Sequence, residues 1–97
     1  MRYTVTWASE IETDLLGRWL SAKPAERQHL TRCVYHIDRA VLRNPEQKGA
    51  PLRGHPGLRF YVAPRVPPQP YVGVVYEVLA DDRVVRVHQF RLISSQA

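Results

Sequence analysis

The chain has 97 residues and a formal net charge of +5, with a sequence pI of about 9.9. A chain of this length forms one domain, residues 1–97, around one small core. The single cysteine, Cys33, excludes an internal disulfide, and no run reaches the ~18 apolar residues needed to span a bilayer. The charge favours anionic partners: nucleic acid, an anionic membrane surface or an acidic protein. We expect a cytoplasmic protein with no membrane attachment.

The N-terminal third predicts a strand followed by two helices. Residues 2–7 alternate apolar and polar side chains, as a half-buried strand does. Ser9 is a plausible N-cap for a first helix, which ends at the break before Pro24. The second helix begins at Pro24 and ends before Asn44–Pro45. Apolar residues recur at helical spacing in both helices, and we expect Trp7, Trp19 and Cys33 to lie in the core.

Residues 44–57 form a loop by composition, with several prolines and glycines and no periodicity. Lys48, Arg53 and His55 lie in it. A loop stiffened by proline presents basic groups with little mobility, which suits phosphate contact. The alternative is an ordinary connector whose cations are solvated.

The C-terminal part predicts an antiparallel meander of three strands, at residues 58–63, 71–80 and 83–92. These runs are rich in Val, Tyr and Phe, and Asp81–Asp82 joins the last two. A proline-rich segment, residues 65–70, links the first two as a stiff open turn.

Side chains two residues apart share one face of a strand, so the meander predicts an apolar face and a polar face. The apolar set of the middle strand is Val72, Val74, Tyr76 and Val78, and in the last strand Val85 and Val87 share a face. Phe90 falls on the opposite face, with His88. The polar face collects Arg59, Tyr61, Glu77, Arg86 and His88, and we expect the functional site there. The predicted fold is α+β, in the order β-α-α-β-β-β, with a helical hairpin packed on one face of a mainly antiparallel four-stranded sheet.

This order of elements, with certain residues, resembles the RelE/ParE superfamily of toxins from bacterial type II toxin–antitoxin systems. The matching residues are Tyr3–Trp7, Asn44–Pro45, Gly49–Gly54, Gly57–Arg59, Val75–Val78, Asp81–Asp82 and Val84–Val87. The resemblance covers nearly the whole chain. It implies that Arg53 lies in a basic segment that faces mRNA, and that Arg59 corresponds to the basic residues of the second strand. It also implies that His88 and Arg91 lie where the last strand supplies catalytic or phosphate-binding groups.

Metal-independent cleavage of RNA by its 2′-hydroxyl needs a base, a cation at the phosphate and an acid. Arg59 and Arg86 are candidate cations, His88 a candidate acid or base, and Glu77 a candidate base or orienting group. Tyr61 is a candidate for stacking on a base. The alternative is a cross-strand ladder of surface ion pairs with no catalytic role. No cofactor is expected, and no His, Cys or Asp spacing indicates a metal site.

Three functions are compatible with the resemblance. The first, which we favour, is a ribosome-dependent mRNA endonuclease, with Lys48, Arg53, His55, Tyr61 and Arg91 as RNA-binding residues. The second is a ParE-like inhibitor of DNA gyrase, and the third is a nontoxic binding module. All three imply an acidic antitoxin as partner.

Overall fold

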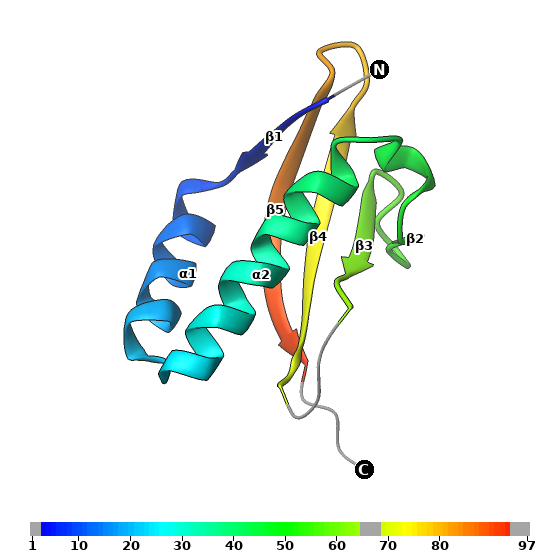
Figure 1. Cartoon of the computed structure of the whole chain (residues 1–97). Helices are drawn as coiled ribbons and strands as arrows, with labels where there is room; N and C mark the ends of the chain where they lie inside the picture. Colours follow the sequence, from blue (N-terminus) through cyan, green and yellow to red (C-terminus); the bar gives the residue numbers. More distant parts are fainter. Residues whose placement is uncertain (1–2, 65–68, 94–97) are drawn as a thin grey trace.

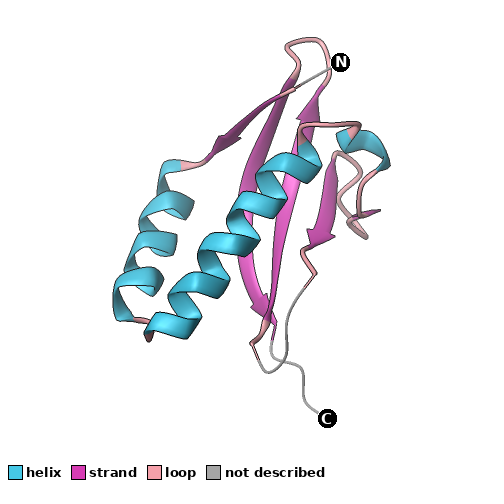
Figure 2. Cartoon of the chain, in the orientation of Figure 1, coloured by secondary structure: helices cyan, strands magenta, loops and turns pink. Residues whose placement is uncertain are grey.

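The computed structural model describes residues 3–64 and 69–93. Two helices pack against one face of a five-stranded mixed sheet (Figures 1 and 2). The elements are β1 Thr4–Trp7, α1 Ser9–Ser21, α2 Pro24–Val41, η1 Pro45–Gln47, β2 Ala50–Pro51, β3 Leu58–Val62, β4 Tyr71–Leu79 and β5 Val84–Ile93. The predicted α+β order is therefore confirmed, with the two-residue strand β2 as an addition. Arg2, four residues of the predicted proline-rich turn (65–68) and the tail lie outside the described residues.

The sheet has the order β1-β5-β4-β3-β2. β1 pairs parallel with β5, whereas the other neighbours pair antiparallel. β1 thus satisfies its backbone groups at the far edge of the meander, next to the last strand of the chain. The indole Nε1 of Trp7 donates a hydrogen bond to Oδ1 of Asp38 at 2.7 Å, which ties β1 to α2.

The turn between β4 and β5 contains no glycine, and another residue supplies the positive φ. A tight hairpin needs a residue with positive φ, and neither Asp81 nor Asp82 is a glycine. Arg83 adopts this conformation, with φ of 54°. Its amide donates to the carbonyl of Ala80 at 3.2 Å and closes the turn.

The core lies between α2 and the middle of the sheet. It comprises Leu30, Cys33, Ile37, Val41, Ala63, Val72, Val74, Tyr76, Val85 and Val87. The α2 members recur at helical spacing and the β4 members alternate, so the predicted apolar face is confirmed. Figure 1 shows α2 crossing in front of β4 and β5.

The first helix packs at the margin of this core rather than inside it. α1 has no buried residue, and Trp19 is 37% exposed. Its ring lies against the guanidinium of Arg27, 4.6 Å from the ring centroid. The prediction of a core role for Trp19 is therefore wrong. The N-cap of α1 is Ala8, with no side-chain cap, so the prediction of Ser9 at this position is wrong as well.

Candidate functional site

The polar face predicted from the sequence is divided between the two sides of the sheet. We call the side away from the helices the open face. In the register of β3 with β4, Arg59 pairs with Tyr76 and Tyr61 with Val74. Both partners are buried under α2. Arg59 and Tyr61 therefore lie on the helix-covered side, and the prediction that they share a face with Glu77 and His88 is wrong.

The reason lies in the alternation of β3. Leu58, Phe60 and Val62 are the apolar set of this strand, and they line the open face instead of the core. Phe60 covers Gly73 of β4: a Cβ built at that glycine would lie 2.8 Å from the Phe60 ring. This close approach shields part of the open face from water and leaves the polar set of β3 facing α2.

The open face holds a carboxylate–imidazole pair. His88 Nε2 lies 2.9 Å from Glu77 Oε1, and the two side chains are 37% and 35% exposed. The contact holds the imidazole ring in one orientation. A hydrogen bond at one ring nitrogen also determines which nitrogen carries the proton. Nδ1 of His88 has no hydrogen-bond partner among the residues described.

An irregularity in the sheet positions this histidine. The β4–β5 register shifts between Val75 and Tyr76, so that Val75 pairs with Gln89 and Tyr76 with Val87. His88 is the extra residue of the resulting bulge and turns toward Glu77. The bulge also reverses the alternation beyond it. Phe90 therefore packs against the core, and the prediction that it shares a face with His88 is wrong.

Two arginines flank the pair on the open face. Arg86 is exposed and pairs in register with Glu77. Residues directly opposite on neighbouring strands have Cβ atoms about 5 Å apart. The guanidinium of Arg91 lies 5.6 Å from the Phe60 ring centroid and donates to Oε1 of Gln89 from Nε at 3.2 Å and from a terminal nitrogen at 2.8 Å. The open face thus combines an oriented imidazole with two cations.

The guanidinium of Arg59 binds backbone carbonyls of the segment that follows α2. Its Nε donates to the carbonyl of Lys48 at 2.9 Å, and a terminal nitrogen donates to the carbonyl of Gly49 at 3.3 Å. The buried hydroxyl of Tyr76 lies 2.7 Å from the carbonyl of Pro45 and 2.9 Å from that of Lys48. Burial raises the pKa of Tyr76, so this hydroxyl keeps its proton. Together these bonds fasten the segment after α2 to the sheet.

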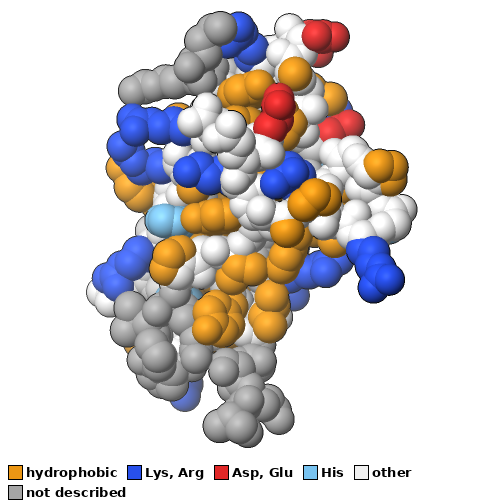
Figure 3. Space-filling view, turned by 90° about the vertical axis from the view of Figure 1, so that its right-hand side faces the viewer, with side chains coloured by type: hydrophobic (Ala, Val, Ile, Leu, Met, Phe, Trp, Pro, Cys, Tyr) orange, Lys and Arg blue, Asp and Glu red, His pale blue; other side chains and the backbone are white. Residues whose placement is uncertain are grey.

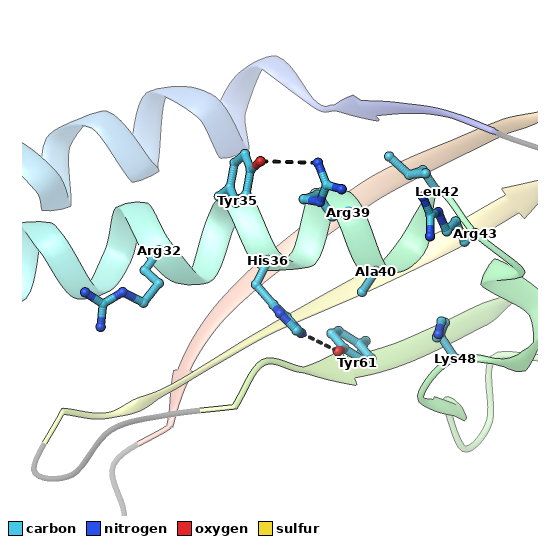
Figure 4. A pocket seen from close by; sticks show the side chains of 9 residues that line it. All are labelled: Arg32, Tyr35, His36, Arg39, Ala40, Leu42, Arg43, Lys48 and Tyr61. Carbon is cyan, nitrogen blue, oxygen red and sulfur yellow. Dashed lines mark hydrogen bonds between the residues drawn. The ribbon is translucent and has the colours of Figure 1, made fainter.

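A second group of polar side chains lines a groove of about 570 Å³ between α2 and β3. His36 of α2 and Tyr61 of β3 meet there, with Nε2 and the hydroxyl oxygen 2.7 Å apart (Figure 4). Their rings lie nearly parallel, at 14°, with centroids 6.0 Å apart. Arg32, Arg39, Arg43 and Lys48 also line this groove. In Figure 3, Lys and Arg side chains alternate with hydrophobic ones along the left-hand margin, with a histidine among them.

The remaining predicted RNA-binding residues are dispersed. Lys48 lines the groove, whereas Arg53 and His55 are exposed in the loop between β2 and β3. The structure therefore places Lys48 and Tyr61 on one groove, and it separately places Glu77, Arg86, His88 and Arg91 on the open face. The roles assigned to these residues stay predictions.

The helical half of the groove was not among the residues predicted from the sequence. Arg32, His36 and Arg39 follow one another at intervals of four and three residues, which places them along one stripe of α2, and Arg43 follows two residues after the helix ends at Val41. That spacing is visible in the sequence. The stripe becomes one wall of a groove only because Tyr61 of β3 faces α2. The register of β3 with β4 was needed to see this.

Among residues 3–64 and 69–93, no three His, Cys, Asp or Glu side chains form a group that would hold a metal ion. In the same part of the chain, every helix is too short or too polar to cross a bilayer.

Comparisons with protein families and with curated proteins give no match. Solved structures do match. A chain of the RelBE2 toxin–antitoxin complex of Mycobacterium tuberculosis is 20% identical and superposes with a TM-score of 0.70, covering 98% of this chain and 95% of that one. The isolated E. coli RelE toxin is 19% identical, with a TM-score of 0.58 over 97% of this chain and 87% of that one.

A mutant of E. coli RelE in complex with a peptide of the antitoxin RelB gives a TM-score of 0.56 at 21% identity, covering 100% of this chain and 87% of that one. These matches span nearly the full length of both partners. The helical hairpin, the sheet and its covered face thus have the arrangement found in RelE toxins. The resemblance indicated by the sequence is confirmed as a shared fold: this chain has the fold of the RelE toxins.

Proposed function

We propose that this chain is the toxin of a type II toxin–antitoxin system, and that it cleaves mRNA on the ribosome without a metal ion. The RelE fold supports a toxin. The observation that carries the chemistry is the 2.9 Å contact between Glu77 and His88, at a bulge on the open face. Bulges next to active sites commonly re-aim a side chain, and here the result is an imidazole with one nitrogen held and the other free among the described residues.

The reaction uses the atoms of the RNA and of this pair. With Nε2 hydrogen-bonded to the Glu77 carboxylate, Nδ1 of His88 removes the proton of a ribose 2′-hydroxyl. The 2′-oxygen attacks the adjacent phosphorus, and the bond from phosphorus to the 5′-oxygen breaks. The imidazolium then returns the proton to the leaving 5′-oxygen, directly or through one water. The products carry a 2′,3′-cyclic phosphate and a 5′-hydroxyl.

Arg86 is assigned the role of stabilising the phosphate during this step. A guanidinium forms two parallel hydrogen bonds to phosphate oxygens, and the charge that develops on those oxygens strengthens the contact. Arg91 lies on the same face as a second cation for the RNA backbone. Arg59 has no part in this chemistry, because its guanidinium donates to backbone carbonyls on the other side of the sheet.

The proposed partner is an acidic antitoxin. The net charge of +5 favours an anionic protein, and the RelBE2 and RelE–RelB structures include antitoxins. Binding across the open face would deny RNA access to the pair and neutralise the cations beside it.

Induced expression in bacteria tests the function, with growth and amino-acid incorporation as readouts. We expect the wild type to stop both, and His88→Ala and Glu77→Gln to relieve the arrest. Lys23→Ala is the matched control, because Lys23 is an exposed cation at the start of α2. It should behave as the wild type does.

Two results would refute the endonuclease. Growth arrest with a DNA-damage response and intact mRNA would indicate gyrase as the target. Unimpaired growth at strong expression, with tight binding of an acidic partner, would indicate a nontoxic binding module.

A further inference from the structure

The groove between α2 and β3 lies on the opposite side of the sheet from the Glu77–His88 pair. Tyr61 is cross-strand from Val74, a core residue, whereas Glu77 is cross-strand from Leu58 on the open face. The groove therefore does not belong to the proposed cleavage site. Its volume of about 570 Å³ is within the range of pockets that hold ligands.

Positive charge lines this groove over an extended length. Arg32 and Arg39 lie along α2, seven residues or about 10 Å apart at the rise of an α-helix, and Arg43 follows two residues after the helix ends at Val41. Lys48 adds a cation from the side of β3. Within the described residues, no carboxylate lies within ion-pair distance of any of these four cations. An elongated run of cations without internal counter-charges suits an extended polyanion rather than a single small anion.

The aromatic pair gives the groove a second property. The rings of His36 and Tyr61 lie nearly parallel and are held together by their 2.7 Å hydrogen bond. Burial raises the pKa of Tyr61, so its hydroxyl keeps its proton. Figure 4 shows this pair in the gap between α2 and β3, with Arg32 and Lys48 to either side along the groove. Flat rings between cations are the arrangement on which bases stack while phosphates contact the charges.

We propose that this groove binds single-stranded RNA, with Arg32, Arg43 and Lys48 at the phosphates and the His36–Tyr61 pair as the stacking surface. An acidic peptide would use the cations and leave the rings without a role, so the aromatic pair favours RNA. The inference rests on the proposed function for RNA as substrate, and adds a place that holds the strand apart from the site of cleavage.

Fluorescence anisotropy with a labelled 2′-O-methyl oligouridine of about ten nucleotides tests the groove. This probe lacks the attacking hydroxyl, so binding is measured whether or not the protein cleaves RNA. We expect the double variant Arg32→Ala/Arg43→Ala to bind at least about tenfold more weakly. The slope of log K against log salt should fall by about 1.4, since each phosphate contact to a single strand contributes about 0.7.

Arg18→Ala/Lys23→Ala is the matched control, because it removes the same charge from exposed positions outside the groove. It should change the affinity less than twofold. Tyr61→Leu removes the ring and should weaken binding about tenfold or more, since stacking contributes about 1–3 kcal/mol per base. Tyr61→Phe keeps the ring and should retain most of the affinity. Circular dichroism establishes that each variant is folded.

Equal binding by Tyr61→Leu and the wild type would overturn the proposal. So would equal losses in the two double variants, because affinity would then follow net charge alone. A polyglutamate peptide that displaces the probe at matched charge concentration would indicate an acidic-protein surface instead. If binding follows the prediction and cellular RNA stays intact, the groove is supported and the cleavage proposal fails.

Discussion

The guanidinium of Arg59 donates a hydrogen bond from Nε to the backbone carbonyl of Lys48, 2.9 Å away. This arginine comes from β3 and the carbonyl from the segment that follows α2. The bond therefore joins the covered side of the sheet to the loop that carries Lys48 into the groove. It makes Arg59 part of the framework of the molecule.

Arg59→Ala should consequently act on stability. Hydrogen bonds from a charged donor contribute about 1.5–3 kcal/mol each, and the carbonyls of Lys48 and Gly49 would lose one each. We expect the free energy of unfolding to fall by about 2 kcal/mol, measured by urea denaturation. Arg59→Lys, which keeps the charge but not the forked geometry, should restore only part of it.

A double-mutant cycle checks the same network. Tyr76 and Arg59 share the Lys48 carbonyl, so the losses from Arg59→Ala and Tyr76→Phe should not add. Additive losses would show that the two side chains act independently.

Gly49 should tolerate no side chain. Its φ is +59°, and a Cβ built there would lie 2.0 Å from the carbonyl oxygen of Phe60. Gly49→Ala should therefore destabilise the protein by more than about 2 kcal/mol in urea denaturation, because the contact is with backbone that cannot move aside. Gly57→Ala is the control. A Cβ at Gly57 meets nothing within 4 Å, and its variant should differ from wild type by less than about 1 kcal/mol. Equal stability of the two variants would contradict the geometry of this loop.

Asp38 should make stability depend on pH. Burial raises the pKa of its carboxyl, although the hydrogen bond from Trp7 opposes the shift. Because the folded pKa is the higher one, the unfolded chain loses this proton first. Stability should fall as pH rises from about 4, where an unfolded aspartate ionises, and level off above the folded pKa. Asp38→Asn keeps an oxygen for the Trp7 indole and removes the ionisation. Unfolding measured from pH 3 to 7 should show that the variant lacks this part of the pH dependence, and parallel curves would contradict the assignment.

The hydrophobic pattern was sufficient to predict the elements and the core side of β4. Val72, Val74 and Tyr76 alternate strictly, and the register places all three beneath α2. The pattern failed at β3. This strand lies near the edge of the sheet, where Phe60 covers Gly73 on the open face and Tyr61 faces a groove. Alternation shows that a strand has two faces, but it does not show which face the helices cover.

Part of the candidate site was predicted from the sequence, and the part that depends on the sheet register was not. Glu77, Arg86 and His88 were expected together, and the structure brings Glu77 and His88 into contact. The bulge at His88 leaves no signature in the residue types, so the reversal that packs Phe90 against the core was not foreseeable. The α2 stripe was visible as spacing, but only the contact of His36 with Tyr61 made it one wall of a groove.

His88→Ala should leave the fold intact, which separates a catalytic role from a structural one. A partly exposed ion pair contributes about 0.2–1 kcal/mol. We therefore expect less than about 1 kcal/mol of lost stability in urea denaturation. A loss of several kcal/mol would show that the pair supports the sheet, and any loss of toxicity would then be a consequence of unfolding.

The most direct test of the central claim is the chemistry of the RNA ends in cells that express the protein. General acid–base catalysis contributes about 10²–10⁴-fold. The wild type should therefore generate mRNA fragments with 2′,3′-cyclic phosphate and 5′-hydroxyl ends within translated codons, and His88→Ala should reduce them by about 100-fold or more. Intact mRNA in arrested wild-type cells, or the same fragments at the same level with folded His88→Ala, would contradict cleavage by the Glu77–His88 pair.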